Sequence, residues 1–249
     1  AAAGAACVTT DGTDIAIQGT GLPPRNLGAT YTNTDFTMSD ETDVVDTTSL
    51  FVYAKHKYAN TTFDQGVLID TRERRRIVGD FTVTILDQVN ERTYPDTVLY
   101  AVTNYDTHGY TTDPYFELEH ATSGKRFSTF LPYRCLLPRA LTGLLVTGLG
   151  VSVHRDAQPL IRMQPDMQNL GYACGVAAAM AQAHDGLPRG IDVKALQRHL
   201  VETKCLEAAV LSQTDSYPLS GERIAEAIDT LAETYGSMAV LLAQPDASL

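Results

Sequence analysis

Apolar and polar residues follow two different patterns along this chain. In the N-terminal half, short alternating runs rich in Thr, Tyr and Val are separated by turn residues, which is typical of strands. Glycine, proline and asparagine cluster in residues 19–26 and 103–114 and predict loops there. The runs that predict a mostly antiparallel sheet are residues 67–69, 81–85, 98–102, 116–118 and 127–131.

After Pro165 the apolar residues recur at helical spacing. A first helix is predicted from about Asp166 to His184, with a face of small residues that favours a close neighbour. A second is predicted after Asp192 and a third after Ser220, residues that suit an N-cap. The apolar positions that recur in the first helix are Met167, Leu170, Cys174, Ala177, Ala178 and Ala181. The positions expected to face the core are Val193, Leu196 and Leu200 in the second helix, and Ile224, Ala227, Ile228, Leu231 and Tyr235 in the third.

A strand, a glycine, a loop and a helix follow one another between these two regions. Residues 142–148 predict a buried strand that ends at Gly148, and Pro165 lies in the first turn of the next helix, where a missing N–H does no harm. A helix start directed at a strand end attracts anions, because its free N–H groups and its dipole favour negative charge. The arrangement is common in α/β proteins, so it indicates an anion site without identifying the ligand.

Composition and charge exclude several classes of protein. The chain has 249 residues, of which 44% are hydrophobic, enough to bury a real core. Its formal net charge is −11 and no basic patch stands out, which argues against nucleic acid as a partner. The longest mainly apolar run, residues 140–153, is interrupted by glycines and is too short to cross a bilayer. We therefore expect neither a nucleic-acid partner nor a membrane association.

The cysteines and histidines form no recognisable cluster. The four cysteines lie far apart without a CxxC pair, and the six histidines are scattered. Disulfide frameworks and zinc sites normally show closer spacing. We therefore expect no metal site, and free thiols in a reducing, cytoplasmic compartment.

Five ordered blocks of sequence lie between about residues 65 and 205. The blocks are TRERRRIVGDF at 71–81 with YPD at 94–96, PYRCLLP at 132–138, GLLVTG at 143–148, GYACGVAAA at 171–179 and IDVKALQ at 191–197. Together they resemble a family of FAD-dependent oxidoreductases in the broad glutathione-reductase-like group of flavoproteins. The expected fold is a mixed α/β fold. It comprises an antiparallel-sheet substrate domain in residues 1–135, the closing strand and helix of a Rossmann-like FAD domain in residues 136–190, and a C-terminal helical segment in residues 191–249.

The resemblance also implies where the cofactor lies. In such proteins the closing helix starts beside the N1/C2=O edge of the flavin ring, where its dipole stabilises the negative charge of the reduced flavin. The chain has a leucine at position 149, where relatives often have an arginine. FAD is expected to be non-covalent, because no His or Cys lies in a recognisable attachment motif. The candidate cofactor-binding residues are Gly148, His154, Arg162, Met163 and Gln164.

Candidate catalytic residues lie in two other segments. The resemblance places an Asp-x-His segment near the substrate, which here is Asp106 and His108, a general base held by a carboxylate. His154 is the rival for this role. The arginine-rich residues 72–76 include Arg75, whose guanidinium suits carboxylates or sugar hydroxyls. Structural histidines and salt bridges within an acidic protein remain the alternatives.

A dinucleotide-binding GxGxxG fingerprint is missing from this sequence. Residues 19–24 lack the third glycine, and their prolines would interrupt the helix that must follow. The alanine-rich residues 1–6 look like the end of a helix. We therefore expect part of a longer or split enzyme, with a companion chain that carries the GxGxxG half.

The function expected from these features is hydride transfer between FAD and a small polar organic substrate, a carbohydrate or a hydroxy acid. Two alternatives remain open. The first is a non-catalytic interaction subunit that retains the flavoprotein fold. The second is part of a flavin-dependent lyase or isomerase. Bound flavin separates the first alternative from the others, and net redox turnover separates the second.

Overall fold

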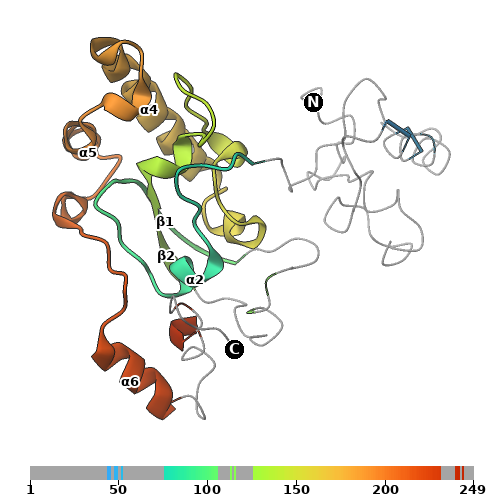
Figure 1. The fold of residues 1–249 in the computed structure, drawn as a ribbon, viewed down its shortest axis with the longest axis vertical. Helices are drawn as coiled ribbons and strands as arrows, with labels where there is room; N and C mark the ends of the chain where they lie inside the picture. Colours follow the sequence, from blue (N-terminus) through green and yellow to red (C-terminus); the bar gives the residue numbers. More distant parts are fainter. Residues whose placement is uncertain are drawn as a thin grey trace. The chain divides into compact units, whose positions relative to one another are not determined.

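The computed structural model describes residues 44–45, 48–49, 52, 76–105, 113, 115, 126–230, 239–241 and 243. The chain divides into two compact units, one made of Ala1–Arg74 with Thr107–Thr111 and the other of Arg75–Asp106 with Thr112–Leu249. The described residues of the first unit are helical. The elements labelled in Figure 1 all belong to the second unit. The predicted strands at 67–69 and 116–118 lie outside the described residues.

Two of the predicted strands form the sheet of the second unit. Strand β1 (Thr97–Asn104) pairs with β2 (Arg126–Pro132) in antiparallel register. Leu99 lies opposite Leu131 in this register, and both side chains are fully buried. Apolar cross-strand pairs of this kind stabilise a sheet. The predictions for residues 98–102 and 127–131 are confirmed.

The predicted strand at residues 81–85 is wrong. Its end is the start of a short helix, α2 (Ile85–Val89), with Thr84 as the N-cap. The Thr84 hydroxyl accepts from the backbone N–H of Asp87, and the Asp87 carboxylate accepts from the backbone N–H of Thr84 at 2.7 Å. This capping box gives partners to the backbone N–H groups of Thr84 and Asp87 at the helix start. In a strand the same groups would need a neighbouring strand as partner. Of the extended run only an isolated bridge at Val83 remains.

The long C-terminal helix confirms the clearest periodicity in the sequence. Helix α4 (Gln164–Ala181) buries Leu170 and Ala177 in the core, and a 3-10 turn continues it to His184. The close neighbour expected at its small-residue face is not found among the described residues. A Cβ added at Gly171 or Gly175 would meet nothing within 4 Å. No described residue therefore covers this part of the α4 surface.

The two remaining helices begin where their caps predict. The Asp192 carboxylate accepts from two backbone N–H groups at the start of α5 (Val193–Glu202). The Ser220 hydroxyl accepts from the first turn of α6 (Gly221–Thr230). The burial expected for Ile228 is wrong, because its side chain is 59% exposed. Leu196, Leu200 and Ala227 are buried as expected, Val193 and Ile224 are half-buried, Ala178 is exposed, and Leu231 and Tyr235 lie outside the described residues.

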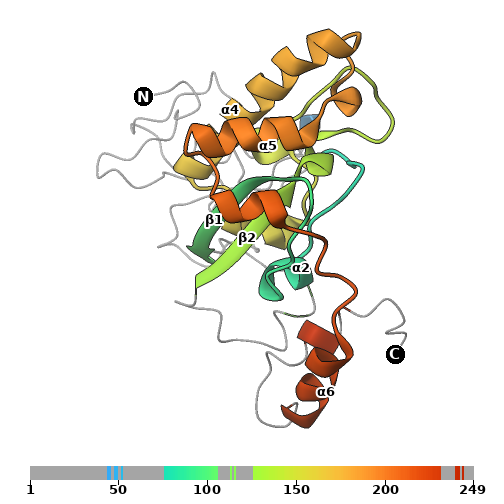
Figure 2. The ribbon, with the colours of Figure 1, turned by 90° about the vertical axis from the view of Figure 1, so that its left-hand side faces the viewer.

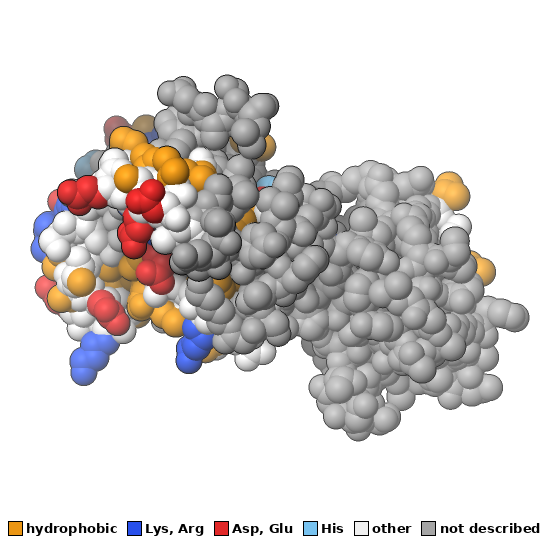
Figure 3. Space-filling model, turned by 90° about the horizontal axis from the view of Figure 1, so that it is seen from below, with side chains coloured by type: hydrophobic (Ala, Val, Ile, Leu, Met, Phe, Trp, Pro, Cys, Tyr) orange, Lys and Arg blue, Asp and Glu red, His pale blue; other side chains and the backbone are white. Residues whose placement is uncertain are grey.

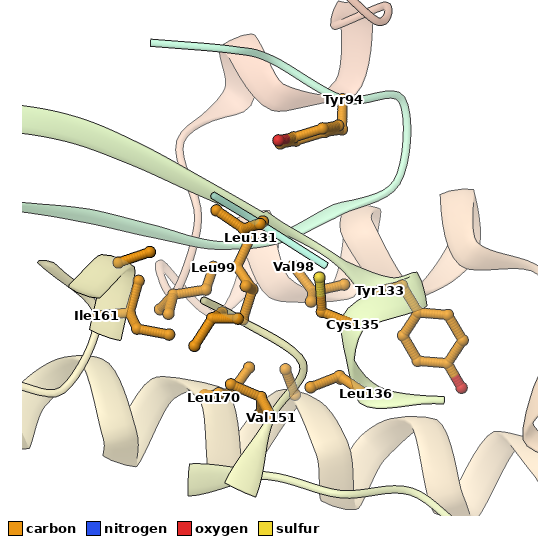
Figure 4. Packing of buried hydrophobic residues seen from close by; sticks show 14 of the residues in the cluster. Tyr94, Val98, Leu99, Leu131, Tyr133, Cys135, Leu136, Val151, Ile161 and Leu170 are labelled. Atoms are coloured by element: carbon orange, nitrogen blue, oxygen red, sulfur yellow. The ribbon is translucent and has the colours of Figure 1, made fainter. Parts of the chain in front are cut away.

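Helices α4 and α5 pack against each other and against β1, while α2 contacts β2 (Figures 1 and 2). The buried side chains between them form one core, in which Leu170 of α4 lies near Val151 and below Leu99 of β1 (Figure 4). Gln197 of α5 adds polar contacts, because its amide nitrogen donates to the carbonyls of Pro95 and Thr97. The core contacts hold α4, and the Gln197 contacts hold α5, against the sheet.

Hydrogen bonds join three of the segments that carry the family resemblance, residues 71–81, 94–96 and 132–138; one of them runs from the Asp80 N–H to the Leu137 carbonyl at 2.9 Å. The Arg134 guanidinium donates to both carboxylate oxygens of Asp96, at 3.0 and 3.1 Å, and so joins PYRCLLP to YPD. Gly79, in the first block, donates to the Ser152 hydroxyl. A Cβ at Gly79 would lie 2.6 Å from the Ser152 Cβ, so only glycine fits there. In this structure these blocks hold the chain segments that lead to α4.

The described surface in Figure 3 carries acidic, basic and hydrophobic side chains without a continuous basic patch. None of the described helices is both long enough and apolar enough to cross a membrane. Within the described ranges, no three His, Cys, Asp or Glu side chains gather in a way that could hold a metal ion.

Candidate functional site

The segment before the candidate site differs from its prediction. Residues 142–148 do not form a buried strand, and Leu144 is 43% exposed. Val146 donates its backbone N–H to the Leu136 carbonyl at 2.9 Å, but the segment pairs with no strand of the described part of the chain. A strand of a parallel sheet needs neighbours on both sides to pair its backbone and cover its apolar side chains. Without them the segment is irregular.

Gly148 ends this segment, as predicted, in a conformation that favours glycine. Its φ is +70°, and a Cβ at this position would meet nothing within 4 Å. The glycine is therefore required by the backbone conformation rather than by a close neighbour. Contacts just beyond it hold the turn, because the Gln158 side-chain amide donates to the Leu149 carbonyl at 2.7 Å. The backbone at Gly148 is fixed and open on one side.

The start of α4 is the second part of the site. The N-cap residue is Met163, and no side chain among the described residues caps this end of the helix. Pro165 lies in the first turn, as predicted, and Gln164 is exposed. Asp166 also lies in the first turn, and burial raises the pKa of its carboxyl group. The first N–H groups of an 18-residue helix are thus left for a negatively charged or carbonyl group from outside.

His154 and its neighbours form the third part. His154 is the N-cap of a 3-10 helix, Arg155–Leu160, and its Nδ1 accepts from the backbone N–H of Asp156 at 3.4 Å. The Asp156 carboxylate is 3% exposed and accepts from Arg155 at 2.8 Å and from the backbone N–H of Asp113 at 2.7 Å. Asp113 is 41 positions away from His154, so the sequence pattern did not reveal it.

One arginine of the predicted cluster reaches the same loop. The Arg76 guanidinium donates to the side-chain carbonyl of Gln158 at 3.4 Å. Burial lowers the pKa of Arg76, and the nearby Asp156 carboxylate acts in the opposite direction. Arg162 is partly buried directly before the α4 N-cap.

Five of the predicted site residues lie in one stretch of the chain, residues 148–164, between the irregular segment and α4, and α4 contacts the turn at Gly148–Gly150. The candidate catalytic residues Asp106, His108 and Arg75 lie outside the described residues. Asp113, Asp156 and Gln158 were missed by sequence reasoning. The sequence did offer a signal for Asp156, namely its position two residues after His154. A side chain at an N-cap accepts a hydrogen bond from the backbone N–H two or three residues onward.

Comparison with known families identifies the family of this chain. A family model described as FAD dependent oxidoreductase matches residues 9–200. This range contains every sequence block quoted above and all the candidate site residues. Neither the comparison with curated proteins nor the comparison with solved structures finds a match.

Proposed function

Because this chain belongs to the family of FAD-dependent oxidoreductases, we propose that it takes part in hydride transfer between FAD and a small polar organic substrate, a carbohydrate or a hydroxy acid. The observation that carries this proposal is the start of α4, which no described side chain caps and which follows the open Gly148 turn. The donors at this end suit the electron-rich edge of a flavin ring, because they favour an oxygen or a negative charge.

The residues of the site have distinct roles in this proposal. The backbone at Gly148 admits a flat ring close to the chain, since no side chain projects there. The N–H groups at Met163 and Gln164 would hold the edge of the flavin ring, and Arg162 and His154 would lie beside it. When bound, FAD supplies the atom that accepts or donates the hydride.

The substrate side of the proposal rests on residues outside the described ranges. His108 removes the substrate proton as a general base, and Asp106 orients its imidazole. Arg75 binds a carboxylate or hydroxyl group of the substrate through its planar guanidinium. In this proposal residues 148–164 bind the flavin, and Arg75, Asp106 and His108 bind and deprotonate the substrate.

A companion polypeptide that carries the GxGxxG unit is also part of the proposal. Seating the pyrophosphate of FAD requires a strand–GxGxxG–helix unit, and this sequence has no such run. Three features support a docking site for such a unit: the half-exposed Leu144, the segment 142–147 that pairs with no described strand, and the positions at Gly171 and Gly175, which no described neighbour covers. Pairing of that segment with a neighbouring strand would cover its apolar side chains.

Replacing Gln164 by Glu is expected to lower the midpoint potential of the bound flavin. A negative charge at the helix start opposes the charge of the reduced flavin and offsets the helix dipole, by about 1 kcal/mol. For a two-electron couple this corresponds to about 20 mV. The potential is measured by spectroelectrochemical titration of the purified assembly.

The matched control for this variant is Gln182→Glu, which adds the same charge at the other end of the helix, just after α4. This variant should leave the potential unchanged. If Gln164→Glu with FAD still bound also leaves the potential unchanged, the start of α4 does not lie at the flavin.

FAD is expected to leave the protein completely on denaturation. No His or Cys lies in an attachment motif, and the described Cys135 and Cys174 are buried thiols whose pKa values are raised by burial, so neither is poised as a thiolate. Acid precipitation of the purified assembly should release all the yellow colour into the supernatant. Colour that stays in the pellet would show a covalent link.

A further inference from the structure

His154 is held in a defined orientation by its own backbone and by one ring nitrogen. Its backbone N–H donates to the Val83 carbonyl at 2.7 Å, and its carbonyl accepts from Ala157 at 3.0 Å. Its Nδ1 accepts from the Asp156 N–H. Asp156 is in turn fixed by contacts with Arg155 and Asp113. The backbone bonds place His154 at the start of the 3-10 helix, and the 3.4 Å contact turns Nδ1 of its ring toward the chain.

This contact determines which ring nitrogen carries the proton. A nitrogen that accepts a hydrogen bond offers its lone pair, so the neutral imidazole of His154 carries its hydrogen on Nε2. The nearest carboxylate oxygen, Oδ2 of Asp113, lies 3.9 Å from Nδ1, too far for a hydrogen bond. Asp113 can attract Nδ1 only after the ring gains a second proton.

The Nε2 side of the ring is available to a ligand. The His154 side chain is 39% exposed, and Nε2 has no hydrogen-bond partner among the described residues. A general base must present a lone pair to its substrate. In this orientation Nε2 presents an N–H group instead, while the lone pair is used in the helix cap.

We propose that His154 is a neutral hydrogen-bond donor that binds an acceptor oxygen of the ligand through Nε2–H, and is not a general base. This rests on the proposed function, since the ligand oxygen belongs either to the flavin ring or to the substrate. A fixed N–H directed at an oxygen that gains negative charge during the reaction stabilises that charge without giving up its proton.

Two variants separate the two nitrogens of the ring. His154→Asn keeps an acceptor near the Nδ1 position and so keeps the cap, but it does not reach the ligand. His154→Gln extends an amide N–H to about the Nε2 position and loses the cap. Donation from Nε2 predicts that the Gln variant retains ligand affinity and that the Asn variant loses it. A role in the cap alone predicts no loss of affinity in Asn and lower stability in Gln.

The test uses the native flavin-loaded assembly and the chain with ¹⁵N-labelled histidine. After removal of FAD, rebinding followed by flavin fluorescence should be weakened about threefold to tenfold in His154→Asn if the acceptor oxygen belongs to the flavin. If it belongs to the substrate, FAD affinity is retained and kcat/KM falls by a similar factor. His154→Gln should lie near the wild type in both. The ¹⁵N shifts of the neutral His154 ring should report the Nε2–H form.

Three results would overturn this proposal. The first is an Nδ1–H form of His154 in the NMR spectrum. The second is an Asn variant that matches the wild type in both FAD affinity and kcat/KM. The third is a wild-type assembly that binds no FAD, which overturns the proposed function as well. The first two results leave the proposed function intact.

Discussion

Replacing His108 by Ala is expected to slow flavin reduction by the substrate roughly a hundredfold or more, with FAD still bound. A general base lowers the barrier because it takes up the substrate proton as the hydride leaves, and alanine cannot do this. The neutral imidazole is the active form. The wild-type rate should therefore fall as the pH drops through the titration of His108, and this dependence should vanish in the variant. Stopped-flow absorbance of the flavin measures the rate.

The matched control is His184→Ala, at an exposed position after α4 that is not part of the proposed site. It should retain the rate and the pH dependence of the wild type. Full activity of His108→Ala would assign His108 a structural role. The base would then have to be sought elsewhere, since the orientation of His154 suits a donor.

Replacing Leu170 by Ala is expected to lower the free energy of unfolding by about 2–5 kcal/mol. The Leu170 side chain is fully buried between α4 and the sheet, so its removal loses apolar contacts and leaves a cavity. Urea denaturation of the full chain, followed by circular dichroism, measures this change.

Ile228→Ala is the control for this variant, because it shortens an aliphatic side chain that is 59% exposed. Its effect should stay within about 0.5 kcal/mol. Equal, small losses in both variants would contradict the packing of α4 against β1, and with it the position of the candidate cofactor site.

Elements with strong local signals could be predicted from the sequence. Helices α4 and α5 combine apolar residues at helical spacing with a proline in the first turn or an aspartate at the N-cap. Strands β1 and β2 are both rich in β-branched and aromatic residues, and burial alternates along most of β2. In these segments the periodicity and the end signals agree, so local chemistry was sufficient.

The errors arose where local and non-local effects compete. Residues 81–85 alternate like a strand, but the capping box of Thr84 and Asp87 favours a helix from Ile85. Residues 142–148 are apolar enough for a buried strand, yet strand formation depends on neighbours that periodicity does not reveal. The apolar residues of α6 recur at helical spacing and predict one apolar face that includes Ile228. The spacing does not show whether a neighbour covers that face, and Ile228 is exposed.

The candidate site was predicted in part. Gly148 and the start of α4 were found because a glycine and a helix start are visible locally. The contact between Asp113 and Asp156 was not, because it joins distant segments of the chain. The roles of Asp106, His108 and Arg75 stay predictions.

Native mass spectrometry of the purified assembly, together with its absorption spectrum, tests most directly whether this chain acts as part of an FAD enzyme completed by a companion polypeptide. The expected result is a flavin spectrum and a complex that contains FAD, this chain and a second polypeptide with a GxGxxG sequence. A stable, FAD-loaded assembly made only of this 249-residue chain would contradict the companion, and a colourless assembly without FAD would contradict the proposed function.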